Sequence, residues 1–208
     1  MIRPLLISAL LAAALWQLGQ GGLIQAKAWL GQFLLERAWV SSADGPEPHK
    51  PWPGAASHPI ARLSVPSLAI DRLVLDGADT PVLAWGPGME VGPNGHHMIA
   101  AHRDTHFRFL EQVELGDAIW LELRGGSARL WRVVDLAVVD SRQTAIDMNL
   151  DQELLTLVTC YPFDGISANG PLRYVVSLLP EREAVLDPEL GAAMLASGRT
   201  GLSARFLP

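Results

Sequence analysis

Residues 156–163 read TLVTCYPF and hold the only cysteine of the chain, Cys160. The stretch ends a short apolar run that is rich in β-branched residues, and a loop of turn-forming residues follows over 161–171. β-branched residues favour strands, and turn residues mark where strands end. The stretch therefore predicts a strand that carries a lone thiol to the rim of a sheet.

Similar short apolar runs lie on both sides of this stretch, and no long helical pattern separates them. This spacing favours a closed or nearly closed antiparallel barrel over alternating strand–helix–strand units. Strands are expected at 61–70, 72–77, 96–102, 117–123, 128–140, 154–160 and 172–179, and short helices near 80–85 and 107–115.

The N-terminal residues 4–24 contain no charged side chain. Their number is close to the ~20 residues with which a helix crosses a bilayer. Arg3 precedes the stretch and Lys27 follows it, so we expect a membrane anchor with its N-terminus inside. A cleaved signal peptide is the alternative, because residues 26–28 have the small-x-small pattern of a cleavage site. Either interpretation predicts an exported chain.

Composition divides the chain into four parts. Residues 1–40 are the expected anchor and juxtamembrane helix, and residues 41–59, with five prolines, form a linker. Residues 60–180 form the expected β-barrel, and residues 181–208 a polar C-terminal extension.

Charge and cysteine content exclude several classes of function. The net charge is −6, from 16 Lys+Arg and 22 Asp+Glu, whereas nucleic-acid binding needs a basic face. A single cysteine cannot form an intrachain disulfide or a thiolate metal cluster.

Cys160 has two interpretations, a buried core residue or a nucleophile at the end of a strand. A nucleophilic thiol needs a nearby base or cation and donors for the oxyanion. His102 ends the expected strand at 96–102, so it could share a rim with Cys160. If the last strand pairs with the cysteine strand, Arg173 also returns close to Cys160.

A metal site is a further possibility, because four histidines fall between residues 96 and 106. His102 and His106 have the spacing of the helical zinc motif, but Arg103 stands where that motif has glutamate. We therefore expect no metal.

Three segments together resemble the sortase family: TLVTC at 156–160, IAAHRDTHF at 99–107 and LRYVV at 172–176. The upstream LSVPSLAIDRLVLDG and GPGM resemble the first strands and helix of that family. The resemblance covers about residues 60–179 and implies a mostly β fold, an eight-stranded sortase-like β-barrel with short helices behind an N-terminal transmembrane helix.

The resemblance implies a cysteine transpeptidase with Cys160 as nucleophile, His102 as acid and base, and Arg173 as oxyanion or substrate donor. It also implies that the backbone N–H of Tyr161 is a second oxyanion donor and that Thr159 lines the peptide groove. No metal or organic cofactor is required.

The implied partners are an exported protein with a C-terminal Leu-Pro-x-Thr-Gly-like signal and an amine acceptor. The single anchor and the CYPFDG run suggest the Gram-negative subgroup, class GN. The chain would then be a single-pass inner-membrane protein with its catalytic domain in the periplasm. Two alternatives stay open, a hydrolytic cysteine peptidase and a non-catalytic β-barrel binding module.

Overall fold

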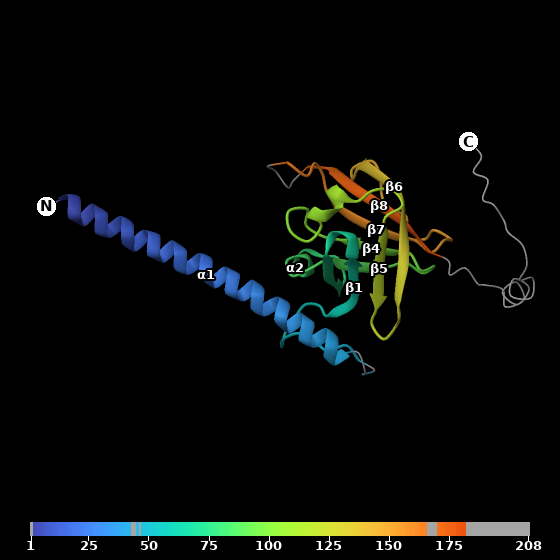
Figure 1. The fold of residues 1–208 in the computed structure, drawn as a ribbon, viewed down its shortest axis with the longest axis horizontal. Helices are drawn as coiled ribbons and strands as arrows, with labels where there is room; N and C mark the ends of the chain where they lie inside the picture. The colour runs from blue at the N-terminus through green and yellow to red at the C-terminus, as the bar shows by residue number, and fades with distance from the viewer. Residues whose placement is uncertain (1, 43–44, 46, 166–169, 182–208) are drawn as a thin grey trace, which may run out of the picture.

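The computed structural model describes residues 2–42, 45, 47–165 and 170–181. A long helix, α1 (Ile2–Ser42), leads into a β-barrel (Figure 1). The helix is continuous across the expected border between the anchor and the juxtamembrane segment, and it ends two residues later than the sequence predicts. The expected C-terminal extension lies outside the described residues beyond 181.

Only the C-terminal part of α1 packs on the barrel, and the rest extends away from it (Figure 1). Leu35 and Ala38 are buried there, and Trp39 packs beside them. Farther toward the N-terminus, large apolar side chains such as Trp16 and Ile24 are exposed. Within the described residues, no helix combines the length and the apolarity needed to cross a bilayer.

The barrel is closed by eight strands in the order β1-β2-β3-β4-β7-β8-β6-β5. The strands are β1 (Pro59–Val65), β2 (Ile70–Asp76), β3 (Gly88–Val91), β4 (His97–Ala100), β5 (Ala118–Leu123), β6 (Ala128–Asp140), β7 (Leu155–Cys160) and β8 (Leu172–Pro180). The helical turns between them are η1 (Pro66–Leu68), α2 (Thr80–Leu83) and η2 (Arg108–Gln112). The predicted eight-stranded barrel with short helices is confirmed.

Most neighbouring strands are antiparallel, as expected, but two pairs are parallel: β2 with β3, and β4 with β7. The β4–β7 pair matters for the site, because two parallel neighbours end at the same rim of the barrel.

The sequence misplaced some strand borders. The strand expected at 61–70 ends at Val65, since Pro66 opens a helical turn and Ala69 adopts a left-handed conformation, and β2 begins only at Ile70. Strand β3 was not among the strands expected from the sequence, because only four residues separate Pro87 from Gly92. The predicted strand at 96–102 ends at Ala100, so His102 lies in the loop that follows.

The barrel interior is filled by alternate residues of the strands. In β1 every second side chain is buried, which is the period of a strand with one face on the core. Phe109 and Leu110 of η2 also enter this core, so the turn that follows β4 is held against the barrel.

Candidate active site

Strands β4 and β7 bring the predicted histidine and cysteine together. Ala100 pairs with Val158, and the N–H of Ala101 donates to the carbonyl of Val158 at 3.2 Å. His102 lies two residues after Ala100, and Cys160 lies two residues after Val158. Neighbouring strands lie about 5 Å apart, so the two backbones are close at this rim.

A cavity of about 170 Å³ opens at this rim. It is lined by His102, Arg103, Asp104, Thr105 and Cys160, and we call it the rim cavity. Cys160 is half-buried and His102 is exposed, so the thiol is not sealed in the core. In the described part of the chain, no three His, Cys, Asp or Glu side chains are grouped to hold a metal ion.

Arg173 lies across from Cys160 on the antiparallel strand β8. The next pair, Tyr161 and Leu172, carries a ladder hydrogen bond, so Cys160 and Arg173 are a non-hydrogen-bonded pair. Such pairs have Cα atoms about 4.5 Å apart and side chains on one face. The Nη1 group of Arg173 donates to the carbonyls of Gly170 and Leu172, at 2.7 and 2.9 Å.

Two residues lie differently from the sequence prediction. Thr159 is only 2% exposed, and its hydroxyl donates to the carbonyl of Ala101 at 2.8 Å, so it joins the two strand ends from inside. The backbone N–H of Tyr161 donates to the carbonyl of Leu172 at 3.0 Å, so the sheet uses the donor that the resemblance assigns to an oxyanion.

Arg103 is a component of the site that sequence reasoning missed. Its side chain is 3% exposed, although it follows an exposed histidine in a loop. Its guanidinium donates to the carbonyls of Pro162 and Gly165, at 2.5 and 2.7 Å, and to the carboxylate of Asp104. Arg103 therefore ties the loop after β4 to the loop after Cys160.

Arg103 and Asp104 each favour the charged form of the other. The hydrogen bond that Arg103 donates to Asp104 raises the pKa of Arg103, and the same bond holds the pKa of Asp104 below its usual range. The negative charge of Cys160 adds to the raised pKa of Arg103. The buried Arg103 side chain thus lies beside the thiol, and both line the rim cavity.

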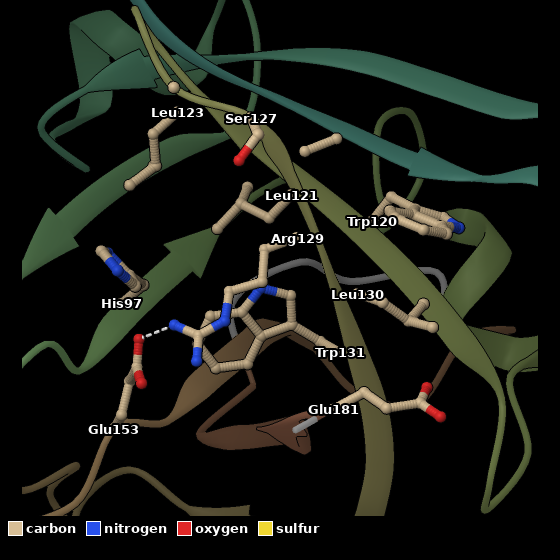
Figure 2. A pocket seen from close by; sticks show the side chains of 12 residues that line it. His97, Trp120, Leu121, Leu123, Ser127, Arg129, Leu130, Trp131, Glu153 and Glu181 are labelled. Carbon is tan, nitrogen blue, oxygen red and sulfur yellow. Dashed lines mark hydrogen bonds and ion pairs between the residues drawn. The ribbon is translucent and has the colours of Figure 1, made fainter. Parts of the chain in front are cut away.

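A larger cavity, about 740 Å³, is lined by the side chains that Figure 2 shows from close by. His97 and Trp131 line it, and Arg129 lies over the Trp131 ring while pairing with Glu153. His97 pairs with Leu155, five residues before Cys160 in β7, which separates the two by about 16 Å along the strand. This distal cavity is therefore not the place of any Cys160 chemistry.

A half-buried thiol at the end of β7, a histidine in the loop after the parallel neighbour β4 and an arginine on the antiparallel neighbour β8 thus meet at one rim of a closed β-barrel. Residues 63–180, more than half of the chain, match the sortase domain family. The chain belongs to the sortase family.

The relatives agree with this assignment. Sortase D of Bacillus subtilis is 32% identical over 133 residues, which cover 61% of this chain and 65% of that protein. The chain thus spans slightly less than two thirds of that relative. A Clostridium perfringens sortase D5 transpeptidase has a TM-score of 0.56 at 20% identity, over 73% of this chain and 98% of that one. A C. perfringens sortase C, solved with the C-terminal cell wall sorting motif, has a TM-score of 0.52 at 19% identity, over 76% and 91%.

Proposed function

We propose that the chain is a transpeptidase that cleaves a sorting signal through a thioacyl intermediate on Cys160 and passes the acyl group to an amine. The observation that carries this proposal is that Cys160 and His102, from the ends of two parallel neighbours, line one cavity. An accessible thiol beside an imidazole is the minimum equipment for acyl transfer by a cysteine nucleophile.

In the first half-reaction, the Cys160 sulfur attacks the scissile carbonyl carbon. A C–S bond forms, the C–N bond breaks, and His102 gives a proton to the leaving amine. Arg173 is the candidate donor to the oxyanion, which requires its guanidinium to turn from the carbonyls of Gly170 and Leu172. Arg103 would hold the loop after Cys160 in place through its hydrogen bonds to the carbonyls of Pro162 and Gly165.

In the second half-reaction, an amine attacks the thioester carbonyl. A C–N bond forms, the C–S bond breaks, and His102 accepts a proton from the attacking amine. Water in place of the amine would make the chain a hydrolytic cysteine peptidase, so the acceptor decides between these two activities.

The substrate we propose is an exported protein with a C-terminal Leu-Pro-x-Thr-Gly-like signal. The sortase C relative that was solved with a C-terminal cell wall sorting motif supports this substrate class. The uncharged residues 4–24 and the exposed apolar side chains of α1 support attachment at the inner membrane, with the barrel in the periplasm. Class GN membership is part of the same proposal and rests on CYPFDG and the single anchor.

The direct test is to incubate the full chain with a Leu-Pro-x-Thr-Gly-type peptide library, with and without triglycine, and to follow the intact mass. We expect an acyl adduct on wild type and none on Cys160→Ala, with faster discharge when triglycine is present. Discharge that is independent of triglycine would favour the peptidase. The absence of an adduct, together with no labelling of Cys160 by iodoacetamide, would favour the binding module.

The proposed location has its own test. Separation of cell membranes from soluble fractions should recover the full chain with the inner membrane, and periplasmic protease should reach the barrel. Recovery in the soluble periplasmic fraction would favour a cleaved signal peptide.

A further inference from the structure

The distal cavity, about 740 Å³, carries two buried polar groups that lack hydrogen bonds. Nδ1 of His97 and Nε1 of Trp131 have no partner among the residues that the structure describes. The two side chains are only 8% and 2% exposed, and both line the cavity. Most buried polar groups are paired, because an unpaired one has given up its hydrogen bonds to water. Two such groups at one cavity therefore point to an occupant that supplies their partners.

Most of the remaining lining is apolar. Leu121, Leu123 and Leu130 contribute aliphatic side chains, and Trp120 and Trp131 contribute aromatic rings. Cavities that hold small ligands measure about 300–1,000 Å³ and are mainly apolar with a few polar groups. The distal cavity, at about 740 Å³, has this size and this composition. Its occupant therefore needs an apolar body.

The charged side chains of the lining are already paired. Arg129 pairs with Glu153, and Glu181 pairs with Arg132 at 2.7 Å. Burial lowers the pKa of His97, so its imidazole is neutral at neutral pH. A charged ligand would lose its water here without meeting an unpaired opposite charge, and that loss is costly. The cavity therefore favours an uncharged occupant.

The two unpaired nitrogens specify the polar part of the occupant. The indole N–H of Trp131 is a donor only, so it needs an acceptor. A neutral imidazole has one donor nitrogen and one acceptor nitrogen, so Nδ1 of His97 needs either an acceptor or a donor, depending on the tautomer. An amide carries a carbonyl oxygen and an N–H, and it meets both requirements in either case. An apolar side chain next to an amide is what one residue of a peptide presents.

Arg129 covers the Trp131 ring in this structure. Its guanidinium carbon lies 5.4 Å from the centre of the ring, and the side chain reaches across to Glu153 (Figure 2). The side chains of Arg129 and Glu153 are 45% and 39% exposed, and an ion pair this exposed contributes little to stability. An occupant can therefore move Arg129 aside to reach the indole nitrogen.

We propose that the distal cavity binds an uncharged apolar residue of a peptide, whose backbone amide forms hydrogen bonds with Trp131 and His97. The cavity is separate from Cys160, so this inference does not depend on the proposed transpeptidase function. The competing occupant is water alone, because a water molecule can also accept from one nitrogen and donate to the other.

The test titrates the full chain, isotopically labelled at its tryptophan nitrogens, with the capped dipeptide N-acetyl-leucyl-leucinamide. Nuclear magnetic resonance follows the indole N–H signals, and the Trp131 signal is identified by its contact with the His97 ring. We expect this signal to shift and to saturate at roughly millimolar probe or below, as a ligand of this size allows. N-acetyl-leucyl-leucine, which has a carboxylate in place of the terminal amide, should bind roughly fivefold more weakly or worse.

Two variants separate the hydrogen bond from the packing. Trp131→Phe keeps an aromatic ring and removes the donor, so the affinity for the capped dipeptide should fall roughly threefold to tenfold, the share of one neutral hydrogen bond. Trp120→Phe is the matched control, because Trp120 lines the same cavity but is not one of the two buried unpaired groups. We expect this control to bind the probe like the wild type.

Several results would overturn the site. A wild-type Trp131 signal that does not shift would mean that water alone occupies the cavity, and a shift confined to other indoles would place the probe elsewhere. Equal or tighter binding of the carboxylate probe would refute the preference for an uncharged ligand. An equal loss in Trp131→Phe and Trp120→Phe would refute the hydrogen bond to the amide. The wild-type titration decides the matter even if Trp131→Phe does not fold.

Discussion

Replacing Arg103 with methionine should lower the free energy of unfolding and slow the alkylation of Cys160. The variant loses the hydrogen bonds to the carbonyls of Pro162 and Gly165, and each bond from a charged donor contributes about 1.5–3 kcal/mol. Loss of both predicts a destabilisation of about 3 kcal/mol or more. For a barrel of this size, that lowers the Tm by about 10 °C.

The same variant should also alkylate more slowly, because it removes the buried cation that shares the rim cavity with Cys160, and the attacking form of any thiol is negatively charged. Cys160 is the only cysteine, so uptake of iodoacetamide by the chain reports on this thiol alone. The rate is measured well below the Tm of the variant. Arg103→Lys keeps the charge without the planar fork, so it should lose stability while keeping more of the alkylation rate.

Arg142→Met is the control for Arg103→Met. Arg142 pairs with both carboxylate oxygens of Asp140, a neighbour in sequence, but its side chain is 70% exposed. We expect its loss to cost about 1 kcal/mol or less. If Arg103→Met melts like Arg142→Met and alkylates at the wild-type rate, the assignment of Arg103 to the site is wrong.

Three other perturbations test separate features of the chain. Thr159→Val should lower the free energy of unfolding in urea by about 1–3 kcal/mol, because it leaves the buried carbonyl of Ala101 without this hydrogen bond. Thr159→Ser keeps the hydroxyl and should retain most of the wild-type stability. Gly31→Ala should speed proteolysis of the 47–58 segment, because its Cβ would collide with Trp85; Gly22→Ala, which meets nothing within 4 Å, should not. Acid should destabilise the fold as the pH falls below about 6.5, because burial lowers the pKa of His97 and the unfolded chain therefore binds the proton more readily. His97→Gln should flatten this dependence in denaturation measured at several pH values, and an unchanged slope would contradict the assignment.

Much of the fold follows from local sequence signals. Runs such as 128–140 and 172–179 carry strong strand propensity, and both are strands in the barrel. Strand β3 lacked such a signal, because four residues after a proline are too few to show the alternation of side chains that marks a strand. The parallel pairing of β4 with β7 depends on which distant strands meet, and local propensity does not encode that.

The sequence predicted those site residues that lie on or next to a strand. It did not predict a residue whose hydrogen-bond partners are far away in the sequence. The position of Cys160 follows from the apolar run before it, and Arg173 from the pairing of the last two strands. Arg103 gave no such signal, because its partners are backbone carbonyls about sixty residues away, which any sequence supplies. Thr159 is buried because the alternation of β7 continues to its end and turns this side chain inward.

The hairpin between β5 and β6 turns at Gly125 and Gly126, on the covalent path from His102 to Cys160. His102 and Cys160 are nevertheless brought to one cavity by the pairing of β4 with β7, and not by that path. A chain divided at the hairpin would leave the histidine on one fragment and the thiol with its arginine on the other. Neither fragment holds all eight strands, so the proposed acyl transfer would return only when the two reassemble, and the barrel could serve as a split reporter of molecular proximity.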